Sequence, residues 1–145
     1  MTTNKSVTVQ NITAEFAQEL IDAAANKAAE ISVPMVISVV DRDGTLKAFL
    51  RMDGAPQLSV DIAQNKAYTA TAFGISTDNW YEFIKDDDPL RLSIPHTDRL
   101  VTFGGGYPIK VNGELIGGIG VSGGHYNQDM QVAATALESA GLSTS

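Results

Sequence analysis

A glycine-rich segment at residues 104–124 constrains the fold of this chain more than any other feature. Asn112 and Gly113 separate two stretches rich in apolar residues, 108–111 and 114–121. An Asn-Gly pair favours a type I′ turn, in which both central residues take a positive φ, and this turn matches the twist of two antiparallel strands. The segment therefore predicts a β-hairpin.

The second strand of this hairpin lacks side chains on part of one face. Because side chains alternate along a strand, Gly118 and Gly120 share a face with Ile116. Glycine weakens a strand, so a bare face indicates that another element approaches the backbone closely. A packed helix, a neighbouring subunit or a flat ligand would each satisfy this pattern.

A binding corner is predicted where this strand ends. Residues 122–125, with the sequence Ser-Gly-Gly-His, lead into a helix expected over about 127–140. The first N–H groups of a helix have no partners within it, and its dipole favours a negative group there. We therefore expect a carboxylate or another anion to bind here. The residues predicted to contact the ligand at this corner are Gly105, Gly106, Gly118, Gly120, Ser122, Gly123, Gly124, His125 and Tyr126.

Lys66 is unusual for its predicted position. It projects from the apolar face of a helix expected over about 58–73. A buried ammonium without a partner would cost several kcal/mol or would lose its proton. Lys66 is therefore expected to reach water along its stem, to pair with a carboxylate, or to hold an anionic ligand. Asp129, on the inward side of the last helix, either caps that helix or meets Lys66, and we count it among the ligand-binding candidates.

His125 and His96 are the only histidines in the chain. A neutral imidazole at the start of a helix suits a metal ligand or a general base, although His125 could equally fill a polar corner without a chemical role. His96 lies on a segment, 89–98, that is expected to be a loop covering something. If the protein is an enzyme, the catalytic candidates are His125 as base, Lys66 as anion holder and His96 on the covering loop.

The remaining elements are less informative about function. They are expected as a helix over 14–31, strands over 35–41 and 45–52, a helix over 76–85 and a strand over 100–103. A short edge strand at 7–9 is an alternative to a frayed terminus. The three aspartates at 86–88 are either a metal site or a solvated stop signal before Pro89.

Composition excludes several classes of protein. The absence of cysteine in 145 residues excludes disulfides, thiolate catalysis and cysteine-based metal sites. A net charge of −7 argues against nucleic acid and anionic membrane surfaces as partners. No apolar run approaches the ~20 residues of a membrane span, and the first ten residues lack the core of a signal peptide. We expect a cytoplasmic protein with a flexible N-terminus at 1–11, one domain at 12–141 and a tail at 142–145.

Four phrases of the sequence, taken together, resemble the GlcG/HbpS-like family. They are VVDRDGTLKAFLRMDGA (39–55), NKAYTATAFG (65–74), GGYPIKVNGELIGGIGVSGG (105–124) and QDMQVAATAL (128–137). That family includes haem-binding proteins and the C-terminal domain of PduO-type corrinoid adenosyltransferases. The resemblance implies a profilin-like fold, with an antiparallel five-stranded sheet flanked by helices. This fold is of the α+β class, which is also called α/β in the wider sense of that term. It also implies homo-oligomers, from dimers to octamers.

The resemblance further implies a small-molecule ligand, haem or a similar carboxylate-bearing compound, near a subunit interface. Haem binders of the family carry a histidine around the first helix, whereas Ala23–Glu30 has none, so iron ligation would move to His125 or His96. The phrase VSGG is usually followed by a small residue, and here His125 and Tyr126 follow it. The alternative functions are a cofactor-free enzyme of the proton-transfer, isomerase or lyase type, acting on a small organic acid in catabolism, and a purely structural or sensory oligomer.

Overall fold

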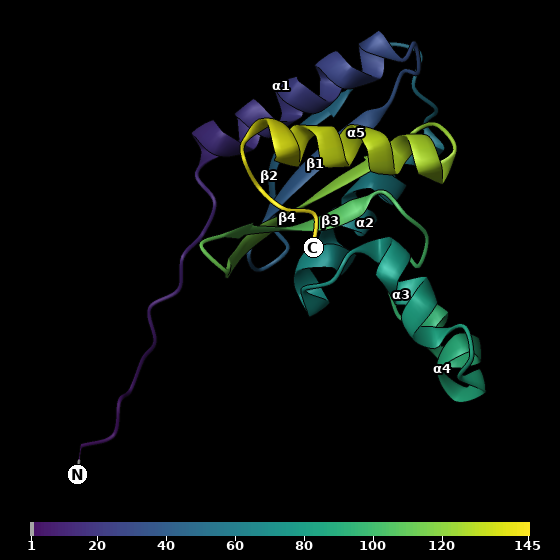
Figure 1. Cartoon of the computed structure of the whole chain (residues 1–145). Helices are drawn as coiled ribbons and strands as arrows, with labels where there is room; N and C mark the ends of the chain where they lie inside the picture. The colour runs from purple at the N-terminus through teal and green to yellow at the C-terminus, as the bar shows by residue number, and fades with distance from the viewer. Residues whose placement is uncertain (1) are drawn as a thin grey trace.

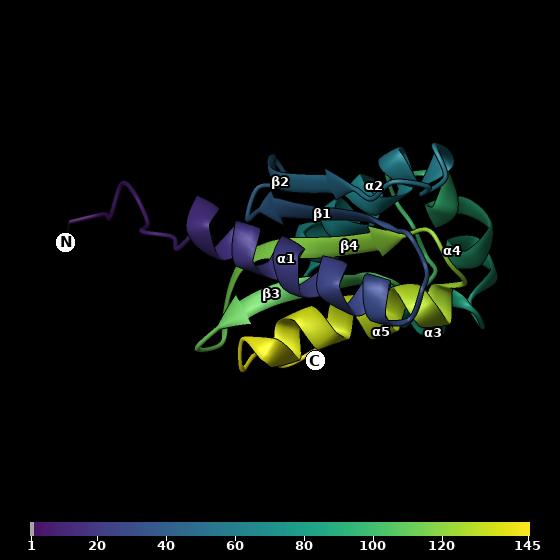
Figure 2. The same cartoon turned by 90° about the horizontal axis from the view of Figure 1, so that it is seen from above.

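The computed structural model describes residues 2–145 and shows one antiparallel sheet between two layers of helices (Figure 1). The elements in chain order are α1 (Ala14–Glu30), β1 (Val36–Asp41), β2 (Leu46–Arg51), α2 (Leu58–Phe73), α3 (Thr77–Ile84), α4 (Asp88–Ser93), the 3₁₀ helix η1 (Ile94–His96), β3 (Gly106–Val111), β4 (Glu114–Ser122) and α5 (Tyr126–Ser139). The strand order is β2-β1-β4-β3. Helices α1 and α5 lie side by side on one face of the sheet, as Figure 2 shows, and α2 packs on the other face.

The predicted hairpin is confirmed. Strands β3 and β4 pair antiparallel, and Asn112 and Gly113 between them have φ values of 53° and 80°, as a type I′ turn requires. The helices expected at 14–31, 58–73, 76–85 and 127–140 are all present, with ends within two residues of the expected ones. The α+β class and the antiparallel sheet are therefore as predicted.

The sheet has four strands and not five, so that part of the prediction is wrong. Residues 100–103 carry the β-branched pattern of a strand, but the backbone around Val101 bonds to a side chain on α2 and not to a neighbouring strand. The Val101 N–H donates to Thr69 Oγ1 at 3.0 Å, and that hydroxyl donates to the Arg99 carbonyl oxygen at 3.0 Å. Residues 7–9 are also outside the sheet. The profilin-like arrangement stays a prediction.

The expected loop at 89–98 is largely helical, which corrects a second prediction. Asp87 is the N-cap of α4, and its side chain accepts a hydrogen bond from the Leu90 N–H at 3.2 Å, while Pro89 lies in the first turn. Asp88 pairs with Arg91 at 2.9 Å. Within residues 2–145 no group of three or more histidine, cysteine, aspartate or glutamate side chains is placed to hold a metal ion. Asp86 follows the end of α3, as a stop signal would, but Asp87 and Asp88 begin the next helix, α4.

Helix α2 explains the bare face of β4. A Cβ atom added at Gly118 would collide with the Ala67 carbonyl oxygen, and one at Gly120 would collide with the Ala63 carbonyl oxygen. The glycines therefore let α2 lie directly on the strand, and alanine on α2 keeps the approach close. Of the three alternatives that the sequence left open, the packed helix is the one observed. In the part of the chain that the structure describes, no helix is long and apolar enough to cross a membrane.

Candidate functional site

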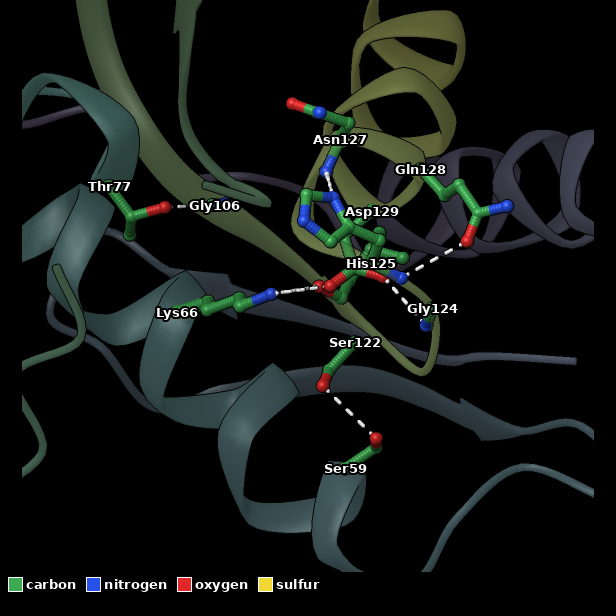
Figure 3. A network of polar contacts seen from close by, with 11 residues as sticks. Ser59, Lys66, Thr77, Gly106, Ser122, Gly124, His125, Asn127, Gln128 and Asp129 are labelled. Atoms are coloured by element: carbon green, nitrogen blue, oxygen red, sulfur yellow. Dashed lines mark hydrogen bonds and ion pairs between the residues drawn. The ribbon is translucent and has the colours of Figure 1, made fainter. Parts of the chain in front are cut away.

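A groove opens where β4 ends and α5 begins, and we call it the α5 groove. Its volume is about 410 Å³. It is lined by Pro56, Leu58, Ser59, Ile62, Phe103, Ser122, Gly123, Gly124, His125, Tyr126 and Asp129. The segments that meet here come from the start of α2, the end of β4 and the start of α5, so the groove lies at the predicted binding corner (Figure 3).

Beneath the groove, Lys66 and Asp129 form a buried ion pair. Lys66 Nζ lies 2.8 Å from Asp129 Oδ2 and donates a second hydrogen bond to the Val121 carbonyl oxygen at 2.9 Å. The ammonium also lies 4.7 Å from the centre of the Phe103 ring, which is a favourable cation–π arrangement. The predicted pairing of Lys66 with Asp129 is therefore confirmed. Because Lys66 is fully buried, it does not reach the groove, and the expectation that it contacts an anionic ligand directly is corrected.

Burial dominates the titration of both partners. Desolvation lowers the pKa of Lys66 below the ordinary lysine value, and the charge and hydrogen bond of Asp129 oppose that shift. Desolvation likewise raises the pKa of Asp129, against the effect of Lys66 and of the Gly124 N–H. The pair thus offsets part of the cost of burial for each partner, and it leaves no net charge beneath the groove when both groups are ionised.

The start of α5 is capped by the chain itself. The Gly124 N–H donates to Asp129 Oδ1 at 3.1 Å, and the His125 N–H donates to Gln128 Oε1 at 3.0 Å. The Asn127 N–H donates to His125 Nδ1 at 3.1 Å, as Figure 3 shows. Two of the backbone donors expected to bind an anion, the Gly124 and His125 N–H groups, therefore already have partners in the chain, which corrects the prediction for these two. Asp129 caps the helix and pairs with Lys66, so both of its alternatives hold together.

The cap determines what His125 can do chemically. A backbone N–H is always the donor, so Nδ1 must be the acceptor and a neutral imidazole carries its proton on Nε2. The side chain is exposed, and its ring lies 4.0 Å from the Tyr126 ring, centre to centre. In this form His125 presents an N–H donor at the rim of the groove. A free lone pair, which a metal ligand or a general base needs, would require loss of the cap.

The other predicted residues divide into two groups. Ser122, Gly123, Gly124 and Tyr126 line the groove, and the Ser122 hydroxyl donates to the Ser59 hydroxyl at 3.1 Å. Gly105 and Gly106 are buried and pack against Lys66, while Gly118 and Gly120 are covered by α2, so these four glycines do not line the groove. His96 is exposed on η1 and is not among the lining residues.

Sequence reasoning missed five residues of the groove wall, which are Pro56, Leu58, Ser59, Ile62 and Phe103. Phe103 was assigned to a strand, although it immediately precedes three glycines, which can mark a close approach of a ligand, and aromatic side chains commonly line ligand pockets. Pro56, Leu58 and Ile62 are ordinary apolar residues at the start of a helix, and Ser59 lies among them. Its signal is weak, since a serine in a first helical turn is common.

The family comparison agrees with this architecture. Residues 12–138 match the family described as "Haem degrading protein HbpS-like". An uncharacterized 15.0 kDa protein of Citrobacter freundii, from the dhaT-dhaS intergenic region, is 42% identical over 136 residues, which are 93% of this chain and 96% of that protein. Corrinoid adenosyltransferase PduO of Salmonella typhimurium is 38% identical over 87% of this chain, but the match spans only 38% of PduO. Protein GlcG of Escherichia coli is 32% identical, over 74% of this chain and 78% of GlcG.

Solved structures give the same result. Klebsiella pneumoniae ORFY has a TM-score of 0.88 and 39% identity, over 95% of this chain and 96% of that one. The PduOC:heme complex has a TM-score of 0.85 and 35% identity, over 92% and 98%. A double mutant of Streptomyces reticuli HbpS has a TM-score of 0.84 and 27% identity, over 94% and 91%. From its sequence and its fold together, this chain belongs to the HbpS-like family.

Proposed function

We propose that this protein binds haem, or a similar flat ligand that carries carboxylates, in the α5 groove. The observation that carries the proposal is an open apolar groove with a histidine at its rim. It occurs in a fold that matches a structure solved as a heme complex with a TM-score of 0.85. A volume of about 410 Å³ lies within the ordinary range of small-molecule sites, roughly 300–1,000 Å³.

The walls of the groove suit an apolar ring. Leu58 is 73% exposed, Phe103 44% and Tyr126 46%, which is unusual exposure for three large side chains around one hollow. Covering them with a flat ligand would remove apolar surface from water at about 25 cal/mol per Å². Ile62 adds a further apolar wall from α2.

The polar groups suit carboxylates on the same ligand. The Nε2–H of His125 is a donor at the rim, and the Ser59 hydroxyl, which accepts from Ser122, keeps its own O–H as a donor. Asp129 also lines the groove, but Lys66 balances its charge, so it does not repel an anion as a free carboxylate would. These three features support binding of a ligand with one or two carboxylates.

His125 could contact bound haem in two distinct ways, by a hydrogen bond to a propionate or by ligation of the iron. In the capped form its Nε2–H would hold a propionate. Ligation of the iron by Nε2 would instead require the proton to sit on Nδ1, at the cost of the hydrogen bond from the Asn127 N–H. Bound haem would supply a redox-active iron whose behaviour depends on its axial ligand. The same occupied lone pair disfavours His125 as the base of a cofactor-free enzyme, and no feature of the groove favours that alternative.

We further propose that the protein forms a homo-oligomer through α3 and α4. Phe73, Phe83 and Leu92 expose more than half of their surface in this region, and burial between subunits would remove that surface from water. Light scattering coupled to size-exclusion chromatography tests this. Phe83→Asp is expected to lower the mass, and a protein that is already monomeric would contradict the proposal.

A hemin titration of the apo-protein tests the proposed ligand and its position. We expect a saturable Soret band with the parent protein and binding at least tenfold weaker for Leu58→Asp, which places a carboxylate in the groove. Leu92→Asp is the matched control, because Leu92 is similarly exposed but lies on α4, outside the groove. Absence of saturable binding by the parent, or equal effects of the two substitutions, would contradict the proposal.

A further inference from the structure

A second cavity lies beside the α5 groove and has a different chemical character. We call it the α3 cavity, and its volume is about 550 Å³. It is lined by Asp78, Tyr81, Glu82, Thr102, Phe103, Gly104, Tyr126, Asn127 and Met130. Phe103 and Tyr126 line both cavities and form the wall between them. The haem proposal leaves this cavity without a role.

Three aromatic side chains line the α3 cavity, and two of them also have a partner in the chain. The Lys66 ammonium lies 4.7 Å from the centre of the Phe103 ring, and the centre of the His125 ring lies 4.0 Å from that of Tyr126. Tyr81 is 54% exposed, and Phe103 and Tyr126 are exposed to nearly the same extent. The Met130 sulfur packs where a Cβ of Gly104 would otherwise be, so a soft, polarizable group lies beside the rings. Aromatic faces carry negative charge density, and several rings around one hollow are the arrangement that recognises organic ammonium ions.

The charged groups of the cavity are negative. Asp78 and Glu82 are four residues apart on α3 and so lie on the same helix face. Glu82 pairs with Lys85 near the surface. Asp78 has no ion-pair partner within residues 2–145, and its Oδ1 is closed to solvent with no hydrogen-bond partner. The lining contains no lysine, arginine or histidine, so nothing in it neutralises Asp78.

The charge of Asp78 also acts on a neighbouring side chain. Burial is the main cause that raises the pKa of Tyr107 to about 12, and the negative charge of Asp78 is the second. The effect shows that the Asp78 carboxylate lies near Tyr107 as well as beside the cavity. A carboxylate beside a hollow of ligand size, with no cationic side chain in the lining, favours a positively charged ligand.

We propose that the α3 cavity binds a small organic ammonium ion, with Tyr81, Phe103 and Tyr126 around its apolar groups and Asp78 opposite its charge. A divalent metal is not supported, because Ca²⁺ and Mg²⁺ need more oxygen ligands than two carboxylates in an aromatic setting supply. The structure places no three metal-binding side chains together anywhere in the described part of the chain. An anion is disfavoured by Asp78 and Glu82.

Calorimetry with two probes of the same shape tests the proposal. Choline carries a quaternary ammonium, and 3,3-dimethylbutan-1-ol is its neutral counterpart. We expect the parent protein to bind choline at least tenfold more tightly than the alcohol, and the difference to shrink in high salt. No binding of choline at millimolar concentration, or equal binding of the two probes, would overturn the proposal.

Two variants locate the site. Asp78→Asn is expected to weaken choline binding at least fivefold, and Tyr81→Leu to do the same without a change of charge. Asp86→Asn is the matched control, because it changes the net charge equally from an exposed position outside both cavities. Equal effects of Asp78→Asn and Asp86→Asn, with no effect of Tyr81→Leu, would show that the attraction is not local and would overturn the site. Thermal unfolding of each variant confirms that it is folded.

This inference is independent of the haem proposal. Asp78→Asn is expected to leave hemin binding unchanged, and His125→Asn, which keeps the cap of α5, to leave choline binding unchanged. Tyr126→Ala is expected to weaken both, since its ring lines both cavities. Loss of choline binding in His125→Asn, which keeps the cap of α5, would contradict the assignment of two separate sites.

Discussion

Lys66 Nζ lies 2.8 Å from Asp129 Oδ2, and neither side chain has appreciable contact with solvent. The two residues are 63 positions apart, and their contact ties α2 to the start of α5 across the end of β4. Asp129 in turn accepts from the Gly124 N–H, so the ion pair and the glycine corner are parts of one network. The pair therefore holds the floor and one wall of the α5 groove together.

Breaking this pair is expected to be costly. Lys66→Met leaves the Asp129 carboxylate buried without its cation, and the free energy of unfolding should fall by about 3–5 kcal/mol. The double variant Lys66→Met/Asp129→Leu should recover much of that loss, because two apolar groups replace two desolvated charges. Urea unfolding measures both.

The surface pair of Lys27 with Glu30 is the control for this experiment. Its nitrogen and oxygen lie 3.2 Å apart where Glu30 is 70% exposed and Lys27 19%, so the pair is in contact with water and Lys27→Met should cost much less than Lys66→Met. If Lys66→Met cost no more than Lys27→Met, the buried pair would not have the structural role described here.

The contact of Gly120 with α2 predicts strong sensitivity to a single methyl group. Gly120→Ala would drive its Cβ into the Ala63 carbonyl oxygen, so α2 must shift, and we expect a loss of roughly 3 kcal/mol or more. Gly74→Ala is the comparison, because Gly74 has open space around it and only its positive φ of 80° resists the substitution, at about 1 kcal/mol. Chemical denaturation measures the free energy of unfolding of both variants. Equal decreases would refute the close approach of α2 to β4.

The role of His125 in capping α5 can be tested separately from its proposed role in ligand binding. His125→Ala removes the acceptor of the Asn127 N–H and should cost about 1 kcal/mol of stability. Asparagine is a good N-cap residue, so His125→Asn should retain nearly all of it. Thermal unfolding of the two variants tests this, and equal melting temperatures would show that the cap contributes nothing measurable.

Tyr107 gives the protein a specific weakness in alkali. Its pKa is raised from 10.0 to about 12 by burial, so the unfolded chain loses the proton at a lower pH than the folded protein. The free energy of unfolding must then fall as pH rises from about 10 to about 12. Between about pH 9 and pH 11.5 the parent should lose roughly 2 kcal/mol more than Tyr107→Phe. Identical losses, measured by urea unfolding at the two pH values, would contradict the shift.

Most of the fold followed from local patterns. The hairpin was predictable because Asn112 and Gly113 impose a turn, and the helices because their apolar residues recur at helical spacing. The fifth strand failed because residues 100–103 look extended and β-branched, while their partner is the Thr69 side chain, which no local pattern reveals. Helix α4 was missed although Asp87 followed by Pro89 is a start signal, because three consecutive aspartates were interpreted as a stop.

The site was predictable in position more than in detail. Glycines on one face of β4 indicate that something lies close, but spacing alone cannot distinguish a helix from a ligand, and α2 fills that space. The unpaired donors at a helix start were predicted to bind an anion. Their actual partners, Asp129 and Gln128, lie five and three residues further along the chain and are close enough to accept these hydrogen bonds in place of a ligand.

The most direct test of haem binding at the α5 groove is a hemin titration of His125→Asn beside His96→Asn. Asparagine preserves the cap at position 125, and His96 lies outside both cavities, so the pair isolates the imidazole at the groove. We predict that His96→Asn reproduces the saturable Soret band of the parent, whereas His125→Asn binds at least tenfold more weakly or shows a shifted band. A parent-like spectrum and affinity for His125→Asn would contradict the account.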